Sequence, residues 1–177
     1  MALRLLVAGS LLLALAACSR PFVSPIPPAP HRDQVAASYE ATWRALIRAL
    51  AFENVPLRAV AKDSGVLASD EMVSPIGVYA DCGRIGDVAL EGDAVVSFTV
   101  FVQANGGAAT DVQVNAKMRT QAWRRGDSGK LKSETVYACA STGRWEANLV
   151  DQIRRLVGEA ANDRPPDPAK DEKKVEK

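Results

Sequence analysis

A long β-hairpin dominates the middle of the chain and limits the folds open to it. Residues 94–103 are rich in β-branched and aromatic side chains and are apolar on both faces, which indicates a central strand. Asn105-Gly106-Gly107 follows as a turn signal. From Thr110 to Arg119 apolar and polar residues alternate, as in a strand with one buried and one solvated face. Two such strands are not stable alone, so we expect further elements to cover their apolar side.

An amphipathic helix is predicted near the start of the folded region. Apolar residues from Val35 to Leu50 recur at helical spacing and share one face. Asp33 is the predicted N-cap, and the helix should end before Pro56. Trp43 lies inside the apolar stripe, so we expect it in the core. The opposite side is interpreted as a solvated face and carries Glu40, Arg44 and Arg48.

A second, shorter hairpin is predicted between this helix and the long hairpin. Residues 57–61 and 66–72 flank the cluster Lys62-Asp63-Ser64-Gly65, which has the composition of a turn. The connection from Ser74 to Asp93 shows no regular period and is expected to be irregular.

The last part of the domain completes the fold prediction. A strand is expected near 131–138, followed by an amphipathic helix from Trp145 to Val157 that Ser141 or Thr142 can cap. Two helices with single apolar stripes need one shared surface. We therefore predict an α+β domain, with an antiparallel sheet of about five strands and an N-terminal and a C-terminal helix packed on one face.

The N-terminal region has the pattern of an exported protein. Arg4 precedes an apolar run, residues 5–15, that is shorter than the roughly 20 residues a spanning helix needs. Residues 1–17 are therefore interpreted as a signal peptide. Leu15-Ala16-Ala17-Cys18 resembles the lipobox of bacterial lipoproteins. The resemblance implies cleavage before Cys18 and acyl chains that anchor the protein in a lipid bilayer. The alternative is an ordinary signal peptide followed by a free cysteine.

The sequence also predicts the location of the exported chain and its division into a linker, a domain and a tail. Ser19 resembles the default signal for the outer membrane, so we expect the periplasmic face of that membrane, with the inner membrane as the alternative. Residues 18–33 form a proline-rich linker of extended, polyproline II character. Residues 34–161 form the single domain, and the polar residues 162–177 are expected to be a disordered tail.

Two cysteines remain once Cys18 is acylated. The periplasm is oxidising, so Cys82 and Cys139 are predicted to form a disulfide. Two separate buried thiols are the alternative.

No catalytic or metal-binding pattern stands out. The only histidine, His31, lies in the proline-rich segment, so Ser128 in Gly126-Asp127-Ser128-Gly129 has no evident base and the motif is interpreted as a polar loop. No His, Cys or carboxylate spacing suggests a metal, and no cofactor is expected. The formal net charge of +1 gives no sign of nucleic-acid binding.

A weak resemblance concerns residues 39–67. Tyr39-Glu40-Ala41-Thr42-Trp43-Arg44-Ala45-Leu46, Leu50 and Asp63-Ser64-Gly65-Val66-Leu67 resemble the helix and hairpin of small helix-grip envelope lipoproteins such as BamC. That group includes a subunit of the machine that folds outer-membrane barrels. The resemblance implies a helix-grip-like fold and envelope proteins as partners.

Two functional hypotheses follow. The favoured one is a non-catalytic binding or scaffold module of the cell envelope, in outer-membrane assembly or maintenance, which binds a protein by its sheet edge. The alternative is a small-ligand-binding or hydrolytic domain with a cleft near Tyr79 and Asp81.

Overall fold

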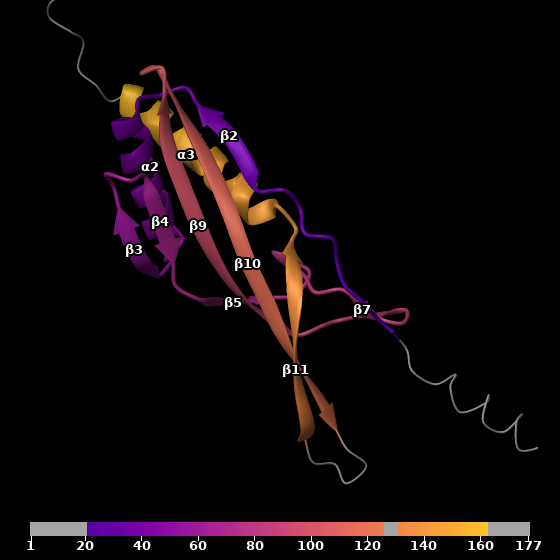
Figure 1. Cartoon of the computed structure of the whole chain (residues 1–177). Helices are drawn as coiled ribbons and strands as arrows, with labels where there is room; N and C mark the ends of the chain where they lie inside the picture. Colours follow the sequence, from indigo (N-terminus) through magenta and orange to yellow (C-terminus); the bar gives the residue numbers. More distant parts are fainter. Residues whose placement is uncertain (1–20, 126–130, 163–177) are drawn as a thin grey trace, which may run out of the picture.

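The computed structural model describes residues 21–125 and 131–162, which form a large antiparallel sheet, a small sheet and two helices (Figure 1). The helices are α2 (Tyr39–Phe52) and α3 (Arg144–Asn162). The strands are β1 (Phe22–Val23), β2 (His31–Val35), β3 (Leu57–Ala61), β4 (Val66–Ser69), β5 (Met72–Pro75), β6 (Ala80–Asp81), β7 (Arg84–Ile85), β8 (Val88–Ala89), β9 (Asp93–Asn105), β10 (Ala109–Arg125) and β11 (Leu131–Ser141).

The main sheet is built around the two longest strands, β9 and β10. Six strands follow the order β3-β4-β9-β10-β11-β6 and curl into a half-barrel. Two more strands join this path, since β5 pairs with β9 and β2 pairs with β10. The small sheet has the order β1-β7-β8. In Figure 1 the helices α2 and α3 lie along β9 and β10, and they also contact each other.

This architecture corrects the predicted fold class. An antiparallel sheet of about five strands with both helices on one face is wrong, because the main sheet has eight strands, six of them curled, and a separate three-stranded sheet exists. The error has a physical source. Strands β6, β7 and β8 have two residues each, too few to show a period of two in the sequence. They lie in the connection that was expected to be irregular.

The long hairpin is confirmed. In β9 every second residue from Ala94 to Val102 is buried, and the residues between them are half-buried or exposed. The strands β9 and β10 pair from Ala109↔Asn105 to Thr120↔Ala94. Gly106 and Gly107 make the turn with positive φ. The alternation predicted for β10 identified its core face, since Val112, Val114 and Met118 are buried. Strand β9, predicted to be apolar on both faces, fully buries only one of them.

Helix α2 begins later than predicted. Its N-cap is Ser38, whose Oγ accepts a hydrogen bond from the Ala41 N–H at 3.4 Å. Asp33 is not the cap but part of β2, and Val35 is a buried strand residue. Val35 was predicted to lie in the helix because it is four residues before Tyr39, a spacing that also fits one face of a helix.

The helices close the core over the main sheet. Trp43 is 5% exposed and lies in the core, as predicted. From α3, Trp145 stacks on Phe98 of β9 with ring centroids 3.6 Å apart. Burial of such aromatic pairs is a large contribution to the stability of a domain.

The proline-rich segment is attached to the domain at both of its ends. Strand β1 pairs with β7, and β2 pairs with β10 from Thr110↔Val35 to Val114↔His31. Residues 21–33, the described part of the expected spacer, therefore contain residues that pair with strands of the domain. Among the residues that the structure describes, no helix is long and apolar enough to cross a membrane.

Candidate functional site

The two cysteines predicted to pair lie at disulfide distance. The Cα atoms of Cys82 and Cys139 are 4.1 Å apart, and their sulfur atoms are within bonding distance. Cys82 follows β6 and precedes β7, whereas Cys139 lies in β11. Because Asp81 of β6 pairs with Ala140 of β11, the cysteine pair links the residue just after β6 to the strand that β6 already pairs with. Cys18 and the signal peptide lie outside the described residues, as do Gly126 to Gly129 of the loop motif.

Tyr79 and Asp81, the residues predicted to line a cleft, flank Ala80 near β6. Tyr79 lines a hollow of only about 50 Å³. Ligand pockets in proteins usually have about 300–1,000 Å³. The carboxylate of Asp81 accepts a hydrogen bond from the Gly83 N–H at 2.8 Å, so it serves the turn before β7. The hollow that Tyr79 lines is therefore smaller than a usual ligand pocket, and Asp81 is not among its lining residues.

Strand β3 is an exposed sheet edge. It stands at the end of the strand order, and within the described chain it pairs only with β4. All five of its residues are exposed, including Leu57 at 39% and Val60 at 52%. An edge strand presents a row of N–H and C=O groups that another strand can pair with. Its single charged side chain is that of Arg58.

Helix α2 holds this edge in place. The Tyr39 hydroxyl donates a hydrogen bond to the backbone oxygen of Lys62, in the turn between β3 and β4. The Lys62 ammonium pairs with Glu40 at 2.8 Å. Partial burial raises the pKa of Tyr39; Lys62 opposes this effect, while Glu40 and Asp63 add to it. The hydroxyl therefore remains a donor at neutral pH.

The outer edge of β2 is covered, in contrast to that of β3. Arg154 of α3 donates a hydrogen bond to the backbone oxygen of Gln34 at 3.0 Å and pairs with the Asp33 carboxylate at 2.5 Å. A guanidinium group with a hydrogen bond to the edge blocks part of the row that a further strand would need. Strand β3 is thus the better template for an added strand.

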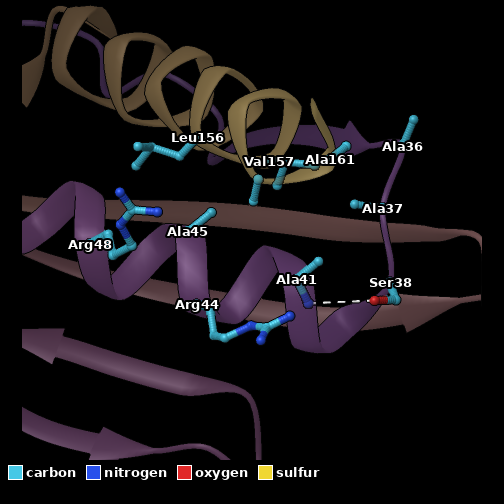
Figure 2. A pocket seen from close by; sticks show the side chains of 11 residues that line it. Ala36, Ala37, Ser38, Ala41, Arg44, Ala45, Arg48, Leu156, Val157 and Ala161 are labelled. Carbon is cyan, nitrogen blue, oxygen red and sulfur yellow. Dashed lines mark hydrogen bonds between the residues drawn. The ribbon is translucent and has the colours of Figure 1, made fainter. Parts of the chain in front are cut away.

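A groove lies between α2 and α3, at the N-terminal end of α2 (Figure 2). Its volume is about 650 Å³, within the usual range of ligand pockets. Most of the lining is apolar, and the polar lining side chains are those of Ser38, Arg44 and Arg48. The apolar lining residues are Ala36, Ala37, Ala41, Ala45, Leu156, Val157, Ala160 and Ala161.

The two arginines of the groove lack carboxylate partners. The spacing of Glu40 and Arg44 is the one that favours an ion pair within a helix, but Glu40 pairs with Lys62 instead. Arg44 and Arg48 form no ion pair within the described chain, although Arg48 lies over the ring of Phe52 at 5.9 Å. From the sequence, both arginines were interpreted as parts of a solvated face. No local sequence signal indicates that Glu40 pairs with Lys62 instead of with Arg44.

A smaller hollow of about 150 Å³ lies beneath the proline-rich segment. It is lined by His31, Ser141 and Glu146, together with strand residues of β10 and β11. Neither Nε2 of His31 nor Oε2 of Glu146 has a hydrogen-bond partner. The Ser141 Oγ accepts a hydrogen bond from the Gly143 N–H at 3.0 Å. A nucleophilic triad needs hydrogen bonds from serine to base and from base to acid, and none joins these three side chains.

In residues 21–125 and 131–162 no cluster of three or more His, Cys, Asp or Glu side chains could hold a metal ion. No family model matches the chain, and a search of curated proteins found no match.

Proposed function

We propose that the protein is a non-catalytic module of the bacterial envelope that holds a partner protein by adding one of its strands to β3. The observation that supports this function best is the exposure of all five residues of β3 at the end of the strand order. Natural sheets protect such edges with charge, proline, bulges or a covering element. Strand β3 has a bulge between Leu57 and Ala59 but little charge and no cover.

Strand addition explains why this edge is apolar as well as free. The partner's backbone would pair with β3, and its side chains would contact Leu57 and Val60. Exposed apolar side chains in β3 then become part of an interface. The fixation of the β3–β4 turn by Tyr39 reduces the conformational entropy that ordering this edge on binding would cost.

Anchoring in the membrane is the second part of the proposal. Leu15-Ala16-Ala17-Cys18 supports acylation at Cys18, and Ser19 supports the periplasmic face of the outer membrane. Cysteines at disulfide distance are compatible with an oxidising compartment. Partners at that place are other envelope proteins, and a role in outer-membrane assembly or maintenance fits a lipid-anchored binding module.

Site-specific photo-crosslinking in cells that make the full-length lipoprotein tests the strand addition. A photo-reactive residue in place of Arg58 is expected to give one discrete protein adduct. Val60→Lys should abolish that adduct, because lysine on an edge strand opposes pairing. Val60 is exposed, so the free energy of unfolding of the variant should differ from that of the parent by less than about 0.5 kcal/mol.

Val88→Lys is the matched control, because Val88 is a strand valine with a similar exposure of 61% in the small sheet. The adduct from position 58 should survive Val88→Lys. An adduct that persists in Val60→Lys would exclude β3 as the binding edge. In a parallel Cys18→Ala strain we expect uncleaved precursor, and a correctly processed, membrane-bound protein would contradict the proposed anchor.

A further inference from the structure

The groove between α2 and α3 combines an apolar floor with unpaired positive charge. Leu156 and Val157 of α3 face Ala41 and Ala45 of α2 across it (Figure 2). The alanines leave the space of about 650 Å³ that larger side chains would fill. Ala45 and Leu156 are already buried, so an apolar ligand would remove mainly the half-buried Ala41 and Val157 from water.

The charge of the groove has one sign. Its two charged lining residues are Arg44 and Arg48, one helical turn apart on α2, and no lining residue is acidic. Figure 2 shows the Arg48 side chain directed toward α3, while the Arg44 side chain runs along α2 toward its N-terminal end, on the side away from α3. The ligand therefore needs an anionic group, and guanidinium forks match a phosphate or a carboxylate.

The lining also decides between a lipid and an extended peptide. Eight of the eleven lining side chains are those of alanine, leucine or valine, so few lining side chains could hydrogen-bond the N–H and C=O groups of an extended chain. Burying those groups without partners is costly. An acyl chain has no such groups. The volume is that of one small ligand, which favours a single chain.

We propose that this groove binds one acyl chain of an anionic lipid, with the lipid phosphate at Arg44 and Arg48. This site is separate from the β3 edge and does not depend on the proposed strand addition.

Titration of the purified full-length protein with three probes tests the site. The probes are dodecyl phosphate below its micelle concentration, zwitterionic dodecylphosphocholine and inorganic phosphate. Dodecyl phosphate is expected to shift the amide signals of Ala41, Ala45 and Val157 in NMR spectra. The zwitterionic probe should bind at least about tenfold more weakly, because its net charge is zero. Inorganic phosphate should bind far more weakly still, because it has no apolar chain.

Variants assign the binding to the groove. Arg44→Gln and Arg48→Gln should each weaken dodecyl phosphate binding by about tenfold. Ala41→Leu should weaken all chain-bearing probes, because it fills the floor without changing charge. Arg155→Gln is the charge-matched control, since Arg155 of α3 pairs with Glu159 at 3.5 Å and does not line the groove. It should bind dodecyl phosphate like the parent protein. Thermal melting of each variant verifies that it is folded.

Three results would overturn the proposal. The first is equal affinity for the anionic and the zwitterionic probe. The second is unchanged affinity when Arg44 and Arg48 are both replaced by Gln. The third is binding that depends on charge but not on the length of the acyl chain, which would make the groove a docking surface for an acidic protein segment.

Discussion

Asp33 illustrates how distant partners change the role of a single residue. By sequence it is a plausible helix N-cap, but in the structure its carboxylate accepts hydrogen bonds from the Gln34 N–H at 2.7 Å and from Arg154. Partial burial alone would raise the pKa of Asp33. The Gln34 hydrogen bond and the Arg154 guanidinium outweigh burial and hold the pKa below its usual value of 3.8.

This lowered pKa predicts a pH dependence of stability. A carboxyl group with a depressed folded pKa contributes stability above its unfolded pKa of about 3.9, and the contribution is lost as the pH falls through the lower folded value. We expect Asp33→Asn to be less stable than the parent at pH 7, by less than about 1 kcal/mol because the pair is partly exposed. Urea unfolding at a series of pH values should show the difference vanishing at strongly acidic pH.

A double-mutant cycle with Arg154→Gln separates this pair from other acid effects. In the Arg154→Gln background, Asp33→Asn should have a smaller effect at pH 7 than in the parent. An effect of Asp33→Asn that is equal in both backgrounds, or that grows as the pH falls, would show that Arg154 is not the partner that matters.

The partners of individual charges are the part of the site that the sequence did not reveal. Glu40 pairs with Lys62 through the hairpin rather than with Arg44 within the helix. His31, which looks isolated in a proline-rich stretch, lines a hollow together with Glu146 from the other end of the domain. Both arrangements depend on contacts between segments far apart in the chain, and local spacing does not encode these contacts.

At the scale of elements, length decided which predictions succeeded. The pattern of β9 extends over 13 residues, and that of α3 over 19, so both were recognised. The pairs of residues that form β1, β7 and β8 are too short for any period. The β3–β4 hairpin was predicted, but its position at a sheet edge was not, because strand order is a property of the whole sheet.

Two turn glycines with nearly equal φ allow a matched test of hairpin geometry. Gly65 has a φ of 68° and Gly106 a φ of 67°. A Cβ at Gly65 would lie 2.0 Å from the backbone oxygen of Val102, whereas a Cβ at Gly106 would meet nothing within 4 Å. We expect Gly106→Ala to cost about 1–2 kcal/mol, the usual cost of the left-handed conformation. Gly65→Ala should cost more than about 3 kcal/mol, because the backbone of β9 must also move.

Thermal or urea unfolding of both variants measures this difference. The Gly65 oxygen accepts a hydrogen bond from the Val102 N–H at 2.8 Å, so Gly65→Ala should also speed amide exchange at Val102. Similar losses of stability in the two variants would contradict the close approach of the β3–β4 turn to β9.

At the scale of the molecule, the cysteine pair fastens the start of the segment that leads from β6 into the small sheet to β11. The small sheet also contacts β11 directly, because the ring centroids of Phe22 in β1 and Tyr137 are 4.4 Å apart. The two cysteines are 57 residues apart in the sequence. A covalent link over a loop of that length restricts the unfolded chain strongly.

Replacing both cysteines by serine should therefore lower the free energy of unfolding by about 4 kcal/mol. The loss should concentrate in the small sheet. We expect faster amide exchange at Gly86 and Leu90, whose N–H groups bond to Pro21 and Gly83, with little change at Val100 in β9. Free-thiol counting on the parent, purified without reductant, checks that the bond forms. Two reactive thiols in the folded parent would refute the disulfide.

If Cys18 carries the proposed anchor, the pairing of β1 with β7 sets the reach of the protein from the membrane. Phe22 is only four residues after Cys18, a distance of at most about 14 Å for an extended chain. With Cys18 in the bilayer, the small sheet would lie just above the lipid headgroups. A pulling force on the anchor would be transmitted through β1 and β7 to Cys82, and from there through the cysteine pair to β11. If β1 detached, the next fixed residue would be His31, and the tether would lengthen to about 45 Å. Loss of the β1–β7 pairing would thus turn a short mechanical connection into a long one.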